Sequence, residues 1–310
     1  MTGRIARTVA VVAGGVVVGV LVLVTLGSLA YNAATSDADV PVTQLWHGRF
    51  VEADGVLTAY RRWGTHGSPI VLVGGFLEPS FVWRGVGPQL ARAGHRVYAL
   101  DLDGFGYTQR RGPSTLAEWA DQVQGFAKAL GLHRPLVVGH SLGAAVAVEV
   151  AHRGGASRIV LLDGDALGGG GPPGWIRTAL LHTPFYTTGY RLVPHASWVV
   201  RRILETAYGP NRPKLDGAEI RRWTDQLRAR GARQGLRRLA EHGLAGFTTA
   251  ELGRMRLRAT VVWGVDDQVD EPSAGRATAR LLHAPFVEIR HAGHLSMLSE
   301  PNTVAAAILR

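Results

Sequence analysis

Leu136-Val137-Val138-Gly139-His140-Ser141-Leu142-Gly143-Ala144-Ala145 joins a short apolar run, a sharp turn and a series of small residues. The turn has the pattern G-x-S-x-G, in which Gly139 and Gly143 flank Ser141. In a nucleophile elbow the serine lies on a strained strand-to-helix turn, where bulky neighbours two residues away would collide with the backbone. The N–H groups at the start of the following helix then face any negative charge that develops beside the serine. An ordinary glycine-rich turn is the alternative, but this context favours a catalytic serine.

Composition excludes several classes of site. The 310 residues suffice for one large domain or two modest ones. Without cysteine, the chain has no disulfide, thiol nucleophile or cysteine-ligated metal. Its formal net charge of +10 comes almost entirely from arginine and suits nucleic acid, an anionic membrane surface or an anionic substrate. No nucleic-acid-binding module is recognisable and the arginines cluster in one region, so we expect no nucleic-acid partner.

The N-terminal region contains an uncharged, mostly apolar run at residues 9–31. As a helix that rises about 1.5 Å per residue, it is long enough to cross a hydrocarbon core about 30 Å thick. Two arginines precede it and two aspartates follow, which predicts residues 1–8 in the cytoplasm and the rest of the chain outside. A cleaved signal peptide and a secreted product are the alternative, although signal peptides have shorter apolar regions. We predict a single-pass membrane anchor followed by a linker at residues 32–45.

From residue 46 onward, strand-like and helix-like segments alternate. The runs 47–52 and 57–63 are joined by Asp54-Gly55, which predicts an antiparallel hairpin. The alternation beyond the hairpin predicts a mostly parallel sheet with helices on both faces. Besides the strand of the elbow, we expect strands at 69–73, 96–100, 158–162, 259–263 and 286–289, and helices that include 83–93 and 116–130.

The alternation stops at Gly168-Gly169-Gly170-Gly171-Pro172-Pro173 and resumes near residue 259. The intervening sequence contains no convincing strand and interleaves arginines with aromatic residues. We predict a helical cap, residues 164–247, inserted into an α/β domain of residues 46–310. Its apolar inner face would line an acyl or alkyl pocket; alternatively its aromatics only pack on the core and its arginines are solvated. Neither metal-ligand spacing nor a phosphate-cradling loop is evident, so we expect no metal and no cofactor.

A serine nucleophile needs a base within hydrogen-bond reach and an acid that orients this base. His294 is the best-placed base because it lies in a short loop directly after a strand, and His291 in the same loop is the alternative. Carboxylates suited to the role of the acid follow the two preceding strands: Asp266, Asp267, Asp163 and Asp165. The order Ser, Asp, His along the chain is the one expected of this elbow architecture.

Four motifs in register make a resemblance specific: Gly139-His140-Ser141-Leu142-Gly143, Asp101-x-x-Gly104-x-Gly106-x-Thr108, Trp263-Gly264-Val265-Asp266-Asp267 and Gly293-His294-x-x-x-x-x-Glu300-Pro301. Over roughly residues 46–310 the chain resembles α/β-hydrolase-fold proteins that carry a helical cap between strands six and seven. The resemblance implies that Asp267, rather than Asp266, is the acid. It also implies an oxyanion hole formed by the backbone N–H groups of Phe76 and Leu142. We expect the substrate pocket to include Gly75, His140, Trp175 and Trp198.

The sequence departs from the family pattern near the oxyanion loop. The family usually has His-Gly ahead of this loop, whereas this chain has Gly74-Gly75. Glu78 stands where a small residue is common, and we expect it to face solvent, because a carboxylate near an oxyanion site would oppose negative charge. Asp103 replaces a residue that is often proline.

These features predict a membrane-anchored serine hydrolase that cleaves a carboxylic ester of a small molecule or a lipid through an acyl-enzyme on Ser141; an amide or a thioester is the alternative bond. The same triad would support hydrolysis of a C–C bond in a β-diketone-like acid, with cap arginines pairing with the substrate carboxylate. A non-catalytic binding protein on this fold is the third alternative. Epoxide hydrolase and dehalogenase chemistry need an aspartate nucleophile, so Ser141 argues against both. The sequence carries no prediction of the oligomeric state.

Overall fold

The computed structural model of the chain describes residues 2–112, 114–168, 173–243 and 246–310. Within these residues the strands form one eight-stranded sheet in the order β1-β2-β4-β3-β5-β6-β7-β8. The pairs β1–β2 and β2–β4 are antiparallel and the remaining pairs are parallel, which confirms the expected hairpin and mostly parallel sheet. The strands are β1 (Arg49–Ala53), β2 (Val56–Trp63), β3 (Pro69–Val73), β4 (Arg96–Leu100), β5 (Leu136–His140), β6 (Arg158–Leu162), β7 (Ala259–Gly264) and β8 (Phe286–Ile289).

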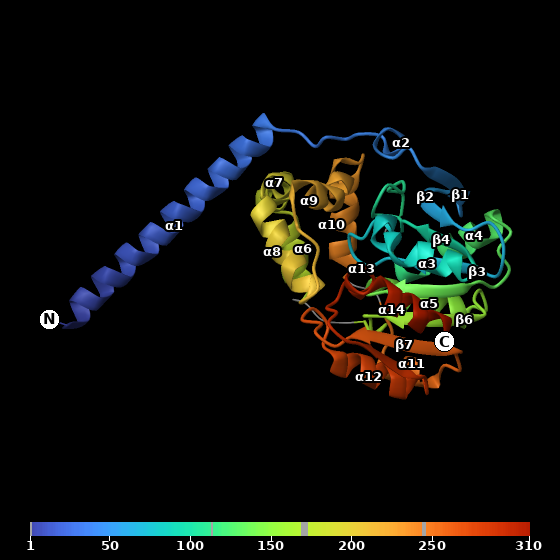
Figure 1. Ribbon diagram of the computed structural model, residues 1–310. Helices are drawn as coiled ribbons and strands as arrows, with labels where there is room; N and C mark the ends of the chain where they lie inside the picture. Colours follow the sequence, from blue (N-terminus) through green and yellow to red (C-terminus); the bar gives the residue numbers. More distant parts are fainter. Residues whose placement is uncertain (1, 113, 169–172, 244–245) are drawn as a thin grey trace.

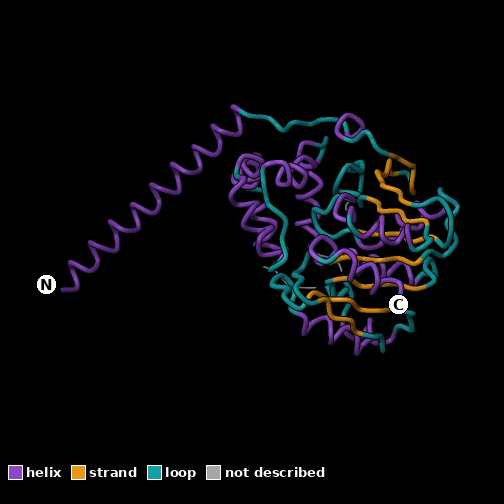
Figure 2. Tube along the Cα trace, viewed as in Figure 1, coloured by secondary structure: helices purple, strands orange, loops and turns teal. Residues whose placement is uncertain are grey.

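Helices cover both faces of the sheet (Figures 1 and 2). In β3, Val71 and Val73 belong to one apolar cluster, whereas Ile70 and Leu72 belong to the other, as the two-residue period of a strand requires. Because both faces are buried, the central strands are nearly uninterrupted runs of Val, Ile and Leu. The helical segments that pack on the sheet are η1 (Ser80–Arg84), α3 (Val86–Arg92), α4 (Leu116–Ala129), α5 (Leu142–His152), α11 (Thr249–Arg254), α12 (Pro272–Leu281), α13 (Ser296–Ser299) and α14 (Pro301–Leu309).

The helix expected over residues 83–93 is interrupted at Gly85, where η1 ends and α3 begins. A Cβ atom on Gly85 would lie 2.7 Å from Cβ of Pro301, at the start of α14. The close approach of α14 therefore requires glycine at this position.

Between β6 and β7 the described residues form a cap of helices. They are α6 (Gly174–Leu181), α7 (Pro184–Leu192), η2 (Val193–His195), α8 (Ser197–Tyr208), α9 (Gly217–Thr224), η3 (Asp225–Arg228) and α10 (Ala232–His242). The two ends of the insertion meet where Leu167 bridges Phe247, and Gly168 N–H donates to the Phe247 carbonyl over 3.0 Å. Of the glycine-rich break expected at its start, residues 169–172 lie outside the described part of the chain.

Helix α1 (Thr2–Ala34) extends away from the rest of the molecule and is longer than the apolar run at residues 9–31 (Figure 1). Its segment Gly14–Ala34 has a mean hydropathy of 2.1 and is long and apolar enough to cross a membrane, a property that signal sequences share. The following linker contains the short helix α2 (Val42–Leu45) and packs on the cap. In this contact the Val40 N–H donates to the Arg228 carbonyl over 2.9 Å.

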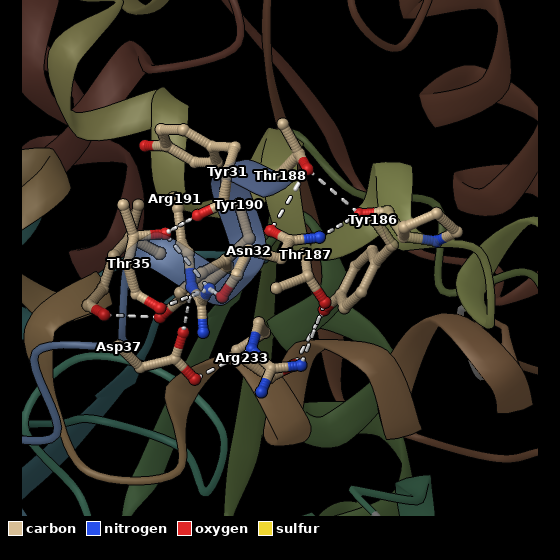
Figure 3. Close-up of polar contacts among 12 residues, drawn as sticks. Tyr31, Asn32, Thr35, Asp37, Tyr186, Thr187, Thr188, Tyr190, Arg191 and Arg233 are labelled. Atoms are coloured by element: carbon tan, nitrogen blue, oxygen red, sulfur yellow. Dashed lines mark hydrogen bonds and ion pairs between the residues drawn. The ribbon is translucent and has the colours of Figure 1, made fainter. Parts of the chain in front are cut away.

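The last turns of α1 lie against α7 (Figure 3). The hydroxyls of Ser28 and Thr188 are 2.5 Å apart, and the amide of Asn32 donates to the Pro184 carbonyl over 2.9 Å. Beyond the helix, the carboxylate of Asp37 accepts hydrogen bonds from Arg191 Nε over 2.9 Å and from Arg233 Nε over 2.8 Å. The N-terminal segment is thereby bonded to two cap helices, α7 and α10.

Candidate active site

Ser141 lies between β5 and α5 with φ 52° and ψ −122°, a strained conformation for a residue with a side chain. The flanking glycines are required by close backbone approach. A Cβ on Gly139 would overlap the carbonyl group of Gly143, and one on Gly143 would lie 2.6 Å from the Val73 carbonyl oxygen. Apolar packing of β5 and the small-residue helix α5 leaves no room for larger residues, so the sequence folds into an elbow that presents Ser141.

His294 and Asp267 are brought together from the loops after β8 and β7. The Nδ1 atom of His294 is 2.9 Å from Oδ2 of Asp267, and both side chains are buried. The other oxygen of Asp267 accepts the N–H groups of Val269 and Asp270 over 2.8 and 3.0 Å, which holds the carboxylate in place. Because Nδ1–H donates to Asp267, the Nε2 atom of His294 is the free, basic nitrogen.

The alternative acid and base residues lie elsewhere. Asp266 and His291 are exposed. Asp165 accepts the N–H of Leu167 over 2.9 Å and shapes its own turn. No hydrogen bond joins Ser141 Oγ to His294 within the described residues; in free enzymes such contacts are often long and shorten only when substrate binds.

The expected oxyanion donors lie on two sides of Ser141. Leu142 is the first residue of α5, and Phe76 belongs to the loop between β3 and η1. Neither backbone N–H donates a hydrogen bond to another described residue, so both are free to meet a substrate oxygen. Gly75 lies directly against the serine, since a Cβ on Gly75 would be 2.8 Å from Cβ of Ser141.

The expectation that Glu78 faces solvent is wrong. Its side chain is buried, and Oε2 accepts the N–H of Gly75 over 2.7 Å. The same oxygen is 2.7 Å from Nδ1 of His140. The carboxylate therefore fixes the oxyanion loop from behind, in a chain whose Gly74-Gly75 lacks the histidine that usually precedes this loop.

His140 does not line the substrate pocket, contrary to the expectation, because its side chain is fully buried. Its Nε2 lies 2.7 Å from the carbonyl oxygen of His294, which can only accept a hydrogen bond, so Nε2 carries a proton. His140 thus joins the oxyanion loop, through Glu78, to the loop of His294. This role of His140 was not predicted from the sequence. The available signal was that two departures from the family pattern, Gly74-Gly75 and Glu78, lie within five residues of each other.

Asp163 lies behind this network. Its Oδ1 accepts the Gly264 N–H over 2.7 Å, and its Oδ2 accepts the Ser296 hydroxyl and is 3.7 Å from Nε2 of His140. Burial raises the pKa of Asp163 to about 7, although His140 and His294 oppose the shift. Burial by itself would lower the pKa of His140, but Glu78, Asp163 and the His294 carbonyl together raise it to about 9. Asp103 is buried too, and its carboxylate accepts the N–H groups of Arg111 and Gly112.

The other two expected pocket residues, Trp175 and Trp198, are also misplaced. Their side chains are 75% and 74% exposed on α6 and α8, so they do not line an enclosed pocket. Other large apolar side chains of α6, α7, η2 and α8 are exposed as well. We call the whole set the apolar cap residues: Trp175, Leu180, Phe185, Leu192, Val193, Trp198 and Ile203. We expected short amphipathic helices to bury their apolar side chains against the core or the pocket. In the structure these helices expose apolar side chains instead.

A mostly parallel sheet with helices on both faces and a serine on the elbow after its fifth strand define the class of α/β hydrolases. The chain belongs to the alpha/beta hydrolase family, whose model matches residues 70–307. Groups of three or more His, Asp or Glu residues suited to a metal ion are not found within the described residues.

The chain is similar to proteins with different hydrolytic reactions. It is 37% identical over 131 residues to the N-formylmaleamate deformylase of Pseudomonas putida, which covers 40% of this chain and 47% of that protein. It is 40% identical over 127 residues to the 2-hydroxy-6-oxo-2,4-heptadienoate hydrolase of another Pseudomonas putida strain. This match covers 37% of this chain and 44% of that protein. The chain thus spans less than half the length of these two curated relatives.

Among solved structures, a bacterial membrane phospholipase A superposes with a TM-score of 0.66 and 21% identity. The match covers 94% of this chain and 97% of that one. This likeness is one of fold.

Proposed function

We propose that this chain is a membrane-anchored serine hydrolase that cleaves a carboxylic ester of a small molecule or a lipid. The buried His294–Asp267 pair, at 2.9 Å, together with an elbow serine carries the proposal. Ser141 Oγ attacks the ester carbonyl, and His294 Nε2 takes its proton and passes it to the leaving alkoxide. The N–H groups of Phe76 and Leu142 stabilise the oxyanion. Water, deprotonated by His294, then releases the acid from the acyl-enzyme.

Three features support a membrane location. The apolar side chains of α1 that the structure describes are largely exposed, as expected of a helix solvated by lipid. The cap helices that carry the apolar cap residues lie on the side of the molecule toward α1 (Figure 1). Exposed tryptophans such as Trp175 and Trp198 favour the membrane–water interface. Arg4 and Arg7, which precede the apolar run of α1, favour a catalytic domain outside the cytoplasm.

Hydrolysis of a C–C bond is the second candidate reaction. It is supported by the 40% identity to a 2-hydroxy-6-oxo-2,4-heptadienoate hydrolase over 127 residues. The cap arginines would then pair with the carboxylate of such a substrate.

One set of assays distinguishes these reactions. Purified full-length protein in detergent is labelled with a fluorophosphonate and assayed on nitrophenyl esters of increasing chain length and on a 2-hydroxy-6-oxo-dienoate. We expect labelling and ester turnover, both lost in Ser141→Ala, with kcat reduced by about 10³-fold or more. A higher kcat/KM on the dienoate would establish the C–C reaction instead, and a serine that is inert in both assays would favour a binding protein.

Topology is tested separately, with reporters fused after Arg310. Alkaline phosphatase should be active there and green fluorescent protein dark, and the fusion should stay in the membrane after a carbonate wash. A soluble, active fusion would mean that the N-terminal segment is a cleaved signal peptide.

A further inference from the structure

A cavity of about 520 Å³ lies between the sheet and the cap, and none of the residues proposed for catalysis lines it. Its walls come from β2, from η1, from the loop after β4, and from α9 and η3. Four arginines and two aromatic residues dominate its lining: Arg61, Arg84, Arg221, Arg222, Phe81 and Tyr107. We call this cavity the arginine pocket.

The carboxylates around the arginine pocket do not neutralise these four charges. The carboxylate of Glu219 pairs with both Arg84, over 2.7 Å, and Arg222, over 3.2 Å. Asp225 also lines the pocket, but it pairs with Arg228 outside the lining, over 3.3 Å.

Two of the four pocket arginines have no carboxylate partner among the described residues. Arg61 and Arg221 form no ion pair and donate no hydrogen bond to any residue that the structure describes. The buried Asp101, which favours the charged form of Arg61, is occupied by the N–H groups of Ser80 and Tyr107. The pocket therefore retains an excess of positive charge.

Two guanidinium N–H groups of the pocket are buried without an acceptor. Nε of Arg61 and Nη1 of Arg84 are shielded from solvent and meet no hydrogen-bond acceptor. A buried charged donor left unpaired is costly, and neighbouring like charges add to the cost. Burial lowers the pKa of Arg61, and the charges of Arg84 and Arg222 act in the same direction. An anion in the pocket would offset the repulsion between these like charges.

Aromatic rings hold the guanidinium groups in place. Arg61 lies over the ring of Trp46 at 4.3 Å, and Trp46 stacks on Tyr107 with 5.4 Å between ring centroids. Arg84 lies 5.1 Å from the ring of Phe81. Planar guanidinium groups fixed in this way are preorganised for bidentate hydrogen bonds to an oxyanion, and little side-chain entropy remains to be lost on binding.

We propose that the arginine pocket binds a phosphate group, carried either by a soluble phosphorylated molecule or by the headgroup of a phospholipid. A phosphate monoester presents three free acceptor oxygens and up to two charges, and the phosphodiester of a lipid headgroup presents two free oxygens and one charge. Their tetrahedral oxygens suit several arginines that converge from different elements better than the planar group of a single carboxylate does. The site is separate from Ser141, so it stands or falls independently of the proposed ester hydrolysis.

Calorimetric titration of the full-length Ser141→Ala protein in detergent tests the proposal, because this variant cannot consume an ester ligand. The probes are inorganic phosphate, glycerol 3-phosphate and the short-chain lipid dibutyryl phosphatidylglycerol, at 50 and 300 mM NaCl. We expect saturable binding that weakens at the higher salt concentration. Binding of glycerol 3-phosphate alone identifies a soluble ligand, and binding of the lipid alone identifies a headgroup site. Absence of binding by all three probes overturns the proposal.

Single charge deletions locate the site. Arg221→Gln removes a guanidinium charge that forms no bond to the described residues, so folding should be unaffected. The affinity for the phosphate probe should fall about tenfold or more. Arg61→Gln should weaken binding similarly. The matched control is Arg201→Gln, which deletes an exposed arginine on α8 outside the pocket and should change affinity less than twofold. Equal affinities for Arg221→Gln and Arg201→Gln would place the anion elsewhere and contradict the proposal.

Discussion

Oε2 of Glu78 lies 2.7 Å from Nδ1 of His140, and this buried pair connects the two halves of the candidate active site. On one side Glu78 accepts the N–H of Gly75, next to Phe76; on the other side His140 donates to the carbonyl of His294. The oxyanion donor and the base must face one carbonyl group at the same time. A shared network holds both loops in register before substrate arrives, which is the arrangement that electrostatic stabilisation of an oxyanion requires.

Glu78→Gln tests this connection. The amide keeps an oxygen for the Gly75 N–H but removes the charge opposite His140, and breaking a buried ion pair costs about 3 kcal/mol or more. We expect a loss of that size in the free energy of unfolding and a lower kcat with little change in KM. The control is Glu52→Gln, in β1, whose side chain is exposed. Chemical denaturation and ester kinetics measure both effects; equal stability of the two variants would contradict the role of the pair.

The stability of the protein should fall as pH rises from about 6.5 to 9. The pKa of His140 is raised from 6.5 to about 9 in the folded state, so its stabilisation is complete below 6.5 and lost through 9. A shift of this size corresponds to about 3 kcal/mol. Asp163 acts in the same direction at lower pH: its pKa is raised from 3.8 to about 7, so its contribution to stability is complete below pH 3.8 and is lost as the pH rises to about 7. Urea midpoints measured between pH 6.5 and 9.5 should decline, and His140→Gln should flatten this decline. A midpoint that rises with pH would refute the assignment.

Asp267 and Asp266 are adjacent in sequence but differ in environment, which provides a matched pair of variants. Asp267 is buried against His294, whereas Asp266 is exposed. Asp267→Asn should lower kcat by about 10³- to 10⁴-fold, because the amide favours the wrong tautomer of His294. Asp266→Asn should leave kcat within a factor of about three. Steady-state kinetics on a nitrophenyl ester decide the matter, and equal losses would remove Asp267 from the triad.

A second matched pair lies at the junction of α1 and the cap. The carboxylate of Asp37 pairs with Arg191 and Arg233 at 2.9 and 2.8 Å in a partly buried site (Figure 3). The carboxylate of Asp39 only approaches Arg230, at 3.4 Å on the surface. Asp37→Asn should lower the free energy of unfolding by about 1–2 kcal/mol, and Asp39→Asn by less than about 0.5 kcal/mol. Hydrogen exchange should rise in α7 for the first variant only. Unchanged exchange in α7 would show that the ion pairs do not hold the junction.

Features set by local sequence were predictable. The elbow, the hairpin and the strands were predicted because their signals are short-range: glycines at fixed spacing around Ser141, Asp54-Gly55 between two strand-like runs, and uninterrupted apolar runs. The neighbourhood of His294 and Asp267 follows from the rule that loops at the carboxyl ends of parallel strands converge.

Features that depend on distant partners were not predictable. Glu78 reaches His140 across 62 residues of sequence, and no local pattern states that a carboxylate there will be buried. Gly85 must be glycine because Pro301 approaches it from the other end of the chain. The placement of Trp175 and Trp198 was wrong for a related reason: in short helices an apolar side chain fits a core, a pocket or a lipid surface equally well, and only the packing of the whole cap selects among them.

The two ion pairs of Asp37 have a mechanical consequence if α1 crosses a bilayer as proposed. A cap that swings away from the sheet must either break both pairs or pull α1 with it. A helix embedded in lipid resists tilting, by fractions of a kcal/mol for each ångström of mismatch between its apolar length and the bilayer. Movement of the cap would then be coupled to the tilt of α1, and so to the thickness of the bilayer.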